Sequence, residues 1–254
     1  MLLDRQCLVG TDRRAVLPRR ARRARPTILA ALLLLILFAP VRAEPLSQEQ
    51  IKDLLARIRT ARAAAPSMEA DFREEKTLRR LNKPIVSSGK MWFQAPDKFR
   101  REVRGNAPSV TISNGRELWI YYPNFKSAER YSLGKRSPVD AAIATINTAL
   151  NLDNVENAFS VTGAKTDSPS PGSGAAGNHY ELTLIPRAAS MKRLFEKFNL
   201  RLNQDLLAER TEMIQPNGER VITIYSNQSR ARVAASVFEF TPPAGTEITS
   251  PLGR

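Results

Sequence analysis

The strongest constraint on the fold is a series of short runs after Pro66 in which apolar and polar residues alternate. Alternation with a period of two is typical of strands, and turn residues such as Asn-Lys-Pro, Ala-Pro-Asp and Asn-Gly separate the runs. Short connections of this kind favour antiparallel neighbours. We therefore predict a mainly β fold of about eleven antiparallel strands. The runs are 71–80, 85–94, 97–105, 109–113, 116–122, 127–133, 159–166, 179–187, 193–204, 206–215 and 219–227.

Two other segments carry helical periodicity. In residues 45–65 apolar side chains recur at the spacing of one helix face, and Ser47 with Gln50 forms a capping-box signature. Residues 137–152 begin with Ser-Pro, which is typical of a helix start. The start of the run at 193–204 is also compatible with a helix. The apolar faces of the two main helices contain Ile51, Leu54, Leu55 and Ile58, and Val139, Ile143, Ile146 and Leu150.

Residues 1–43 have the features of a secretory leader. Several arginines between Arg13 and Arg25 precede an apolar run that is shorter than the roughly 20 residues of a spanning helix. Val41 and Ala43 supply the small side chains that favour cleavage before Glu44. We predict a signal peptide at 1–43, cleaved after Ala43, followed by a single domain at 44–254 in the periplasm. An uncleaved membrane anchor is the alternative.

Charge and cysteine content narrow the class of partner. The formal net charge is +14, and the leader carries nine arginines and two aspartates, so half of that charge leaves with it. The remaining basic residues are scattered along the chain, which disfavours nucleic acid as a partner. Cys7, inside the leader, is the only cysteine. The mature chain therefore has no disulfide and no cysteine metal site, and we expect a monomer with one ordinary core.

The sequence offers little for catalysis. His179 is the only histidine, and it borders residues 167–178, a stretch of small and turn-forming residues that we interpret as a loop. A histidine at a loop edge is expected to be solvated. Neither a Gly-x-Ser-x-Gly nor a His-x-x-x-His pattern accompanies it. We therefore predict a protein that is not an enzyme and that uses no metal and no cofactor.

The stretch SNGRELWIYYP, residues 113–123, is apolar on both faces of its predicted strand. Leu118, Ile120 and Tyr122 point one way, and the intervening aromatic residues point the other. Neighbouring runs supply matching apolar residues, so the sequence predicts an apolar inner surface over several strands. Two interpretations stay open at this point: a packed core beneath helices, or a lipid cavity that the helices only partly fill. The residues assigned to this surface are Phe72, Met91, Phe93, Phe99, Val110, Ile112, Leu118, Ile120 and Tyr122.

Three motifs bear on that choice. They are SGKMWFQAPDKFRREV (88–103), TISNGRELWIYYP (111–123) and FEFTPPAGTEI (238–248), and they follow one another along the chain. Together they resemble the outer-membrane lipoprotein carrier (LolA-type) family. The resemblance implies an incomplete eleven-strand antiparallel barrel, with helices as a lid over an apolar cavity. The lid would then comprise Leu54, Leu55, Ile58, Ile143 and Ile146.

The resemblance also implies a function. Members of the family carry the acyl chains of lipoproteins across the periplasm, from an inner-membrane ABC exporter to an outer-membrane receptor. We therefore expect a periplasmic carrier of lipoprotein acyl chains. A glycolipid-binding or other lipid-binding protein of the same fold, and a lipoprotein-sensing regulator, are the alternatives.

One position departs from the family pattern. In the best-known branch an arginine precedes the proline of the x-Pro-x-x-Phe motif and holds the lid shut, whereas this chain has Ala95 there. Phe99 matches the aromatic residue of the motif. Arg101 lies two residues further on the same strand face and is our candidate for a replacement latch. An exposed arginine at the barrel rim is the alternative for Arg101.

Overall fold

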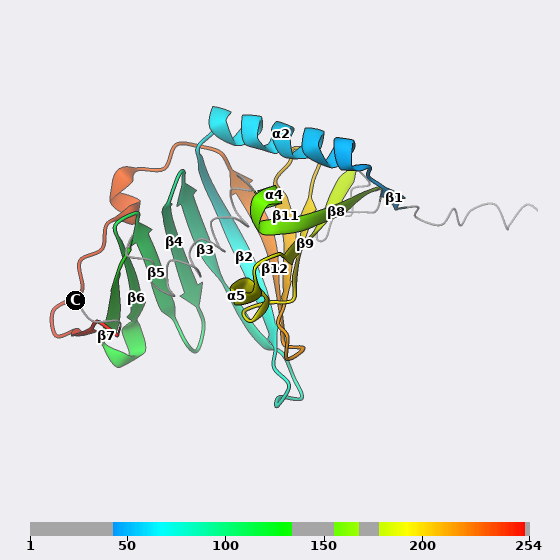
Figure 1. Cartoon of the computed structure of the whole chain (residues 1–254). Helices are drawn as coiled ribbons and strands as arrows, with labels where there is room; N and C mark the ends of the chain where they lie inside the picture. Colours follow the sequence, from blue (N-terminus) through cyan, green and yellow to red (C-terminus); the bar gives the residue numbers. More distant parts are fainter. Residues whose placement is uncertain (1–42, 134–154, 168–177, 252–254) are drawn as a thin grey trace, which may run out of the picture. The chain divides into compact units, whose positions relative to one another are not determined.

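The alternating runs form one sheet in the computed structural model, which describes residues 43–133, 155–167 and 178–251. The strand order is β1-β8-β9-β10-β11-β12-β2-β3-β4-β5-β6-β7-β13. Neighbours are antiparallel, except that β13 pairs with β7 in parallel. The sheet begins and ends with different strands, so it does not close on itself (Figure 1). The prediction of a mainly β, incomplete antiparallel barrel is confirmed.

The described residues contain thirteen strands rather than about eleven. The two additional strands, β1 (Glu44–Pro45) and β13 (Glu247–Thr249), are too short to produce an alternating pattern in the sequence. Each predicted run overlaps one of the other strands. These are β2 (Ser67–Thr77), β3 (Ile85–Gln94), β4 (Lys98–Arg104), β5 (Ser109–Asn114), β6 (Glu117–Tyr122), β7 (Ser127–Ser132), β8 (Phe159–Thr166), β9 (His179–Pro186), β10 (Lys197–Leu202), β11 (Ala208–Ile214) and β12 (Arg220–Ser229).

The long helix, α2 (Gln48–Ala64), begins where the capping box predicted. The Ser47 hydroxyl accepts a hydrogen bond from the Gln50 N–H at 3.2 Å, and the Gln50 side chain accepts one from the Ser47 N–H at 2.7 Å. These two bonds satisfy donors that the first turn of a helix leaves unpaired. Figure 1 shows α2 running across the strands rather than along them.

The apolar face of α2 packs against one end of the strand order. Leu55 and Ile58 are fully buried, at 0% exposure. Their neighbours come from β8, β9, β10 and the short segments beside them, and together these residues form the largest core cluster of the described residues. The cluster includes Ile51, Leu54, Leu55, Ile58, Val155, Phe159, Val161, Leu182, Leu184, Phe195, Leu200 and Leu202.

Four short helical segments connect the strands. They are η2 (Pro123–Phe125), α4 (Val155–Ala158), α5 (Ala189–Lys192) and η3 (Ala235–Phe238). None of the helices in the described ranges is both long and apolar enough to cross a membrane. The helix predicted at 137–152, and most of the loop predicted at 167–178, lie outside the described residues.

Strand pairing gives the sheet two faces with different coverings. The face beneath α2, called the helix face here, carries Phe72, Met91 and Phe99. Residues 235–246, called the C-terminal strap here, lie against the opposite, outer face. The Phe240 ring of this strap lies 5.6 Å from the Trp119 ring and 5.5 Å from the Tyr121 ring, centre to centre. The apolar outer face of β6 is thus explained by packing against the strap.

Two further contacts fasten the strap. The guanidinium of Arg100, on the outer face of β4, donates a hydrogen bond to the Val237 carbonyl at 3.1 Å. Phe238 is buried, at 1% exposure, and η3 contacts both β4 and β5. Beyond the strap, β13 joins the sheet beside β7. The C-terminal part of the chain therefore covers the outer face of β4 to β6 with aromatic side chains.

The prediction that Val110 and Ile112 face the inner surface is wrong. Val110 pairs with Tyr121 and Ile112 pairs with Trp119, so both lie on the outer face. The reason is the parity of the hairpin, in which Ser113 pairs with Leu118 across an even number of loop residues. Directly paired residues share a face, so an even loop places odd-numbered residues of one strand beside even-numbered residues of the next.

A glycine in β3 allows the helix face to pack closely. Gly89 pairs with Phe72 on β2 and with Val103 on β4. A Cβ atom at this position would lie 1.8 Å from the Glu102 carbonyl oxygen and 2.8 Å from Cζ of Phe72. Both distances are shorter than van der Waals contact, so only glycine permits this packing.

We predict that Gly89→Ala destabilises the protein by about 1–3 kcal/mol, because the added methyl group must displace backbone. The measurement is urea unfolding, with Ser88→Ala as the control on the same strand. Ser88 is exposed, so its change should stay within about 0.5 kcal/mol. Alanine is otherwise more stable than glycine within a strand, so a gain in stability at position 89 would contradict the packing described.

Candidate functional site

The helix face contains a cavity of about 390 Å³ between the sheet and the C-terminal end of α2. Its walls come from both halves of the sheet, because β12 pairs with β2 at the centre of the strand order. Aromatic, aliphatic and sulfur-containing side chains predominate. The apolar lining residues include Met68, Phe72, Met91, Phe93, Phe99, Phe198, Leu206, Leu207, Met213 and Val221.

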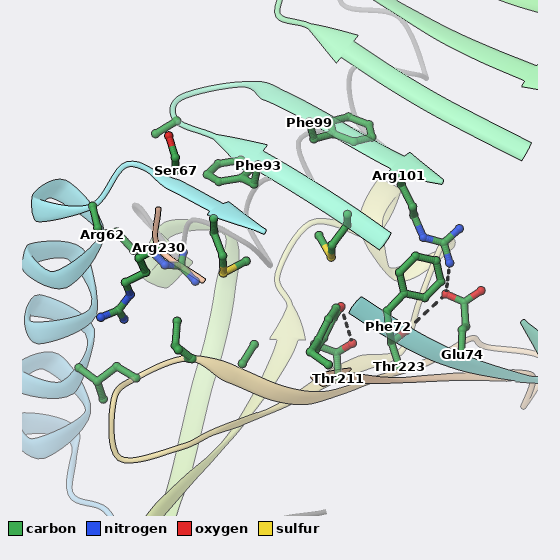
Figure 2. Close-up of a pocket in the computed structure, with 18 of the residues that line it drawn as sticks. Arg62, Ser67, Phe72, Glu74, Phe93, Phe99, Arg101, Thr211, Thr223 and Arg230 are labelled. Carbon is green, nitrogen blue, oxygen red and sulfur yellow. Dashed lines mark hydrogen bonds and ion pairs between the residues drawn. The ribbon is translucent and has the colours of Figure 1, made fainter. Parts of the chain in front are cut away.

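Four of the nine residues predicted for the inner surface line this cavity: Phe72, Met91, Phe93 and Phe99. Their common orientation follows from alternation within β2, β3 and β4 and from the register between these strands. Phe93 pairs directly with Phe99, so the two rings share one face. Figure 2 shows both rings beside each other at the cavity.

Leu118, Ile120 and Tyr122 lie on the helix face of β6 but are not among the lining residues. Leu118 is buried against Phe93 and Phe99, in a small cluster that also contacts Ile120. Leu118 and Ile120 therefore support the cavity wall from the side rather than forming it. The cavity residue on β5 is Thr111, which pairs with Arg101 on β4.

The wall formed by β10, β11 and β12 was not predicted. The sequence of β12 is apolar on both faces, with Val221 and Tyr225 on the helix face and Ile222 and Ile224 on the outer face, so alternation alone does not mark an inner surface. Pairing between β12 and β2 decides the matter by placing Tyr225 beside Phe72. No signal in a single sequence reveals such a distant pairing.

The residues predicted for the lid occupy a different place. Leu54, Leu55 and Ile58 are buried in the core cluster with β8 to β10, and none of them lines the cavity. The C-terminal end of α2 contributes Arg62 to the cavity lining instead. Ala65, the residue directly after the helix, also lines the cavity. Ile143 and Ile146 lie outside the described residues, so a lid formed by both helices stays a prediction.

A polar group of side chains interrupts the apolar wall (Figure 2). The Arg101 guanidinium donates to the Glu74 carboxylate at 2.7 Å, and its centre lies 4.2 Å above the Phe72 ring. The Thr223 hydroxyl donates to the same carboxylate at 3.3 Å. Arg101 is thus bound to β2, and its described hydrogen bonds do not reach α2. Its role as a latch for the helix at 137–152 stays a prediction.

A second polar contact lies beside this group. The hydroxyls of Thr211 and Tyr225 are 3.2 Å apart, within hydrogen-bond distance. Burial raises the pKa of Tyr225 above its ordinary value. The phenol of Tyr225 therefore stays protonated at physiological pH. In this form it is a neutral hydrogen-bonding group in the cavity wall.

His179 does not occupy the solvated position that the sequence suggested. It is buried, at 2% exposure, and its Nδ1 atom lies 3.0 Å from a Glu209 carboxylate oxygen. Burial follows because His179 starts β9 within the sheet and pairs with Thr166. It does not line the cavity. Within the described ranges, no three His, Cys, Asp or Glu residues are grouped so that they could hold a metal ion.

The fold and the site together define a half-open barrel with an internal apolar cavity. Residues 63–241 match the family described as "Outer membrane lipoprotein carrier protein LolA". The chain belongs to this family.

Individual relatives are distant. The chain is 23% identical to an outer-membrane lipoprotein carrier protein of Coxiella burnetii, over 87% of this chain and 96% of the relative. It is 26% identical to one of Bordetella avium, over 87% and 95%. Among solved structures, an uncharacterized conserved protein of Thermus thermophilus is 10% identical, over 79% of this chain and 98% of that one, with a TM-score of 0.49. Family membership therefore rests on the sequence match.

Tyr131 packs against the small cluster of Phe93, Phe99 and Leu118 beside the cavity, and it affects the unfolding free energy at alkaline pH. Burial, and then a hydrogen bond to Glu129, raise the pKa of Tyr131 to about 12. Unfolded tyrosine ionises near pH 10. The stabilisation by this phenol is therefore complete below about pH 10, and it is lost as pH rises to about 12, because the unfolded chain loses its proton first.

We predict that Tyr131→Phe reduces the decline of the unfolding free energy between about pH 10 and 12. Chemical unfolding across this range measures the slope, and phenolate absorbance of the folded protein should lose its step near pH 12. Equal slopes for the wild type and the variant would show that Tyr131 does not hold its proton in this way.

Proposed function

We propose that this protein is a periplasmic carrier, which holds the acyl chains of lipoproteins in its cavity and moves them towards the outer membrane. The observation that supports this proposal most directly is the apolar cavity of about 390 Å³ on the helix face. Membership of the lipoprotein carrier family agrees with it. The proposal makes the protein a binding protein and not an enzyme.

The hydrophobic effect limits how such a carrier can work. Each buried methylene contributes about 0.8 kcal/mol, so one sixteen-carbon chain gains on the order of 12 kcal/mol. Three such chains would exceed the practical limit of non-covalent affinity, near 18 to 21 kcal/mol. A carrier that bound all of them fully would not release its cargo. We propose that opening a lid uses part of this free energy, so that release remains feasible.

The size of the cavity agrees with this mechanism. A volume of about 390 Å³ lies near the lower end of small-molecule sites, which span about 300–1,000 Å³. Cargo with several acyl chains would need more space than a cavity of this volume provides. In the proposal that space comes from movement of helices, with the segment at 137–152 as the second part of the lid and Arg101 as its latch.

The cellular route is part of the same proposal. The leader at 1–43 would direct export and be cleaved after Ala43, so that the carrier works in the periplasm as a monomer. An inner-membrane ABC exporter would supply the cargo and an outer-membrane receptor would accept it, as the family resemblance implies. Lipids that co-purify with the mature protein identify the cargo by native mass spectrometry. A lipoprotein acyl group supports the proposal, and a glycolipid would replace it with the glycolipid-binding alternative.

The first test of the cavity is photo-crosslinking with a diazirine-labelled acyl chain. We expect labels on Phe93 and Phe99, which line the cavity, and not on Trp119 or Arg116. Trp119 lies on the outer face beneath the strap. Labelled sites are mapped by tandem mass spectrometry. Labels that favour Trp119 would place the acyl site on the outer face and contradict the proposal.

The second test changes the polarity of the wall. Met91→Gln keeps the length of the side chain but places an amide against the acyl chain, where it lacks a hydrogen-bond partner. Such burial costs about 1–3 kcal/mol, so we expect the affinity for an acyl probe to fall about tenfold or more. Lys90→Gln is the matched control, because Lys90 is on the same strand but the opposite face, in an ion pair with Glu69. Equal losses in both variants would contradict binding in this cavity.

A further inference from the structure

The polar groups of the cavity wall form a continuous row across the sheet. Thr211 on β11 pairs with Thr223 on β12, and Thr223 pairs with Glu74 on β2. Directly paired residues point to the same face, so these three side chains lie next to one another. Arg101 on β4 extends the row by its ion pair with Glu74. The row therefore crosses the wall from β11 to β4.

Close packing at β3 makes this span possible. β3 lies between β2 and β4, and its residue opposite Phe72 is Gly89, which has no side chain. The Phe72 ring approaches the backbone there, within 2.8 Å of where a Cβ atom would be. The Arg101 guanidinium stacks 4.2 Å above this ring and reaches Glu74 from β4. The ion pair is thus held in a defined place at the cavity.

The members of the row satisfy one another. The Glu74 carboxylate accepts hydrogen bonds from Arg101 and from Thr223, and Thr211 shares a hydrogen bond with Tyr225. The side chains of Arg101 and Glu74 are 30% and 24% exposed, so both charges also retain contact with water. An acyl chain that covered this pair would remove water from two charges and return no hydrogen bond, which is unfavourable.

The row lies near one end of the apolar lining. Met68, Phe93 and Phe99 line the cavity on the side towards Ser67, where β2 begins. On the other side of the row the lining continues with Phe198, Met213 and Val221, which are paired across β10, β11 and β12 two residues beyond Thr211 and Thr223. An acyl chain that enters from the Ser67 end would therefore pass Arg62 and Arg230 at the start of the lining, then the apolar wall, and then the Arg101–Glu74 ion pair (Figure 2).

We propose that the Arg101–Glu74 ion pair determines the length of the acyl chain that the cavity accepts. Methylenes up to the pair gain the full benefit of burial, whereas a longer chain reaches the apolar residues beyond the pair only by covering its two charges. This inference rests on the proposed function, because it concerns the same cavity and the same class of cargo. It adds the residues that select among acyl chains of different length.

The experiment uses a series of lysophosphatidylcholines from decanoyl to octadecanoyl, below their micelle-forming concentrations, as competitors of a fluorescent acyl probe. For the wild type we expect affinity to rise about fourfold per methylene and then to level off. In the double variant Glu74→Leu/Arg101→Met the row keeps only its neutral hydroxyl groups, so the rise should continue to longer chains. The longest competitor should bind about tenfold more tightly than to the wild type.

The double variant is preferred to single changes, because removing one partner leaves an unpaired charge, whereas replacing both with apolar residues is often neutral for stability. The matched control is Arg73→Leu/Glu75→Leu, which removes a neighbouring ion pair on the outer face of β2. Its length profile should equal that of the wild type. Thermal unfolding of each variant establishes that it is folded.

The outcomes separate the two proposals. A longer preferred chain in the Glu74→Leu/Arg101→Met variant alone supports the inference. Equal weakening of all chain lengths in that variant would mean that the pair binds the polar head of the ligand or that Arg101 acts as the lid latch, and in either case the inference would be wrong while the carrier proposal stands. Absence of displacement by any competitor in the wild type would overturn both.

Discussion

The packing of α2 on β8 to β10 determines where a cavity can form. Leu55 and Ile58 are completely buried there, so the apolar stripe of the helix is used at one end of the strand order. A sheet this wide exposes more apolar surface than one helix stripe can cover. The cavity wall is formed by β2 to β4 and β10 to β12. Of the helix, only Arg62 near its C-terminal end lines this cavity, together with Ala65 just after the helix. The cavity is a direct consequence of this off-centre packing.

On the outer face, by contrast, the apolar side chains are covered. Its aromatic residues on β6 are covered by the strap, whose Phe240 contacts both Trp119 and Tyr121. Arg100 fixes the strap at Val237. β4 and β6 therefore separate two environments, with a packed aromatic layer on one side and a cavity or its supporting cluster on the other. Filling one face tightly stabilises strands whose other face is left available.

Local sequence patterns were sufficient to predict most of the strands and the start of α2. Each of the eleven runs overlaps a strand, and Ser47 starts α2 with the expected capping box. Phe72, Met91, Phe93 and Phe99 were identifiable because alternation within a strand fixes which residues share a face. Val110 and Ile112 were assigned to the wrong face because that step crossed a hairpin, where the number of loop residues sets the parity.

Features that depend on pairing between distant strands could not be predicted from the sequence. The wall from β10 to β12 depends on pairing between residues such as Glu74 and Thr223, which are 149 positions apart. The burial of His179 likewise depends on its pairing with Thr166 across residues 167–178, and the local sequence there suggests only a loop edge. Such pairings follow from the competition among all strands of the sheet. Periodicity within one run contains no information about them.

β1, the first strand in the sheet order, protects one edge of the sheet and lies directly after the predicted cleavage site. β1 consists of Glu44 and Pro45, and it pairs with Lys165 and Ala164 of β8. Proline has no N–H to offer a further strand, and an acidic neighbour also discourages strand addition. If the leader is removed after Ala43, this protected edge is the new N-terminus itself. A cut only two residues later would remove Glu44 and Pro45 and expose β8 to edge-to-edge association, so the site of cleavage would also decide how well the exported chain resists aggregation.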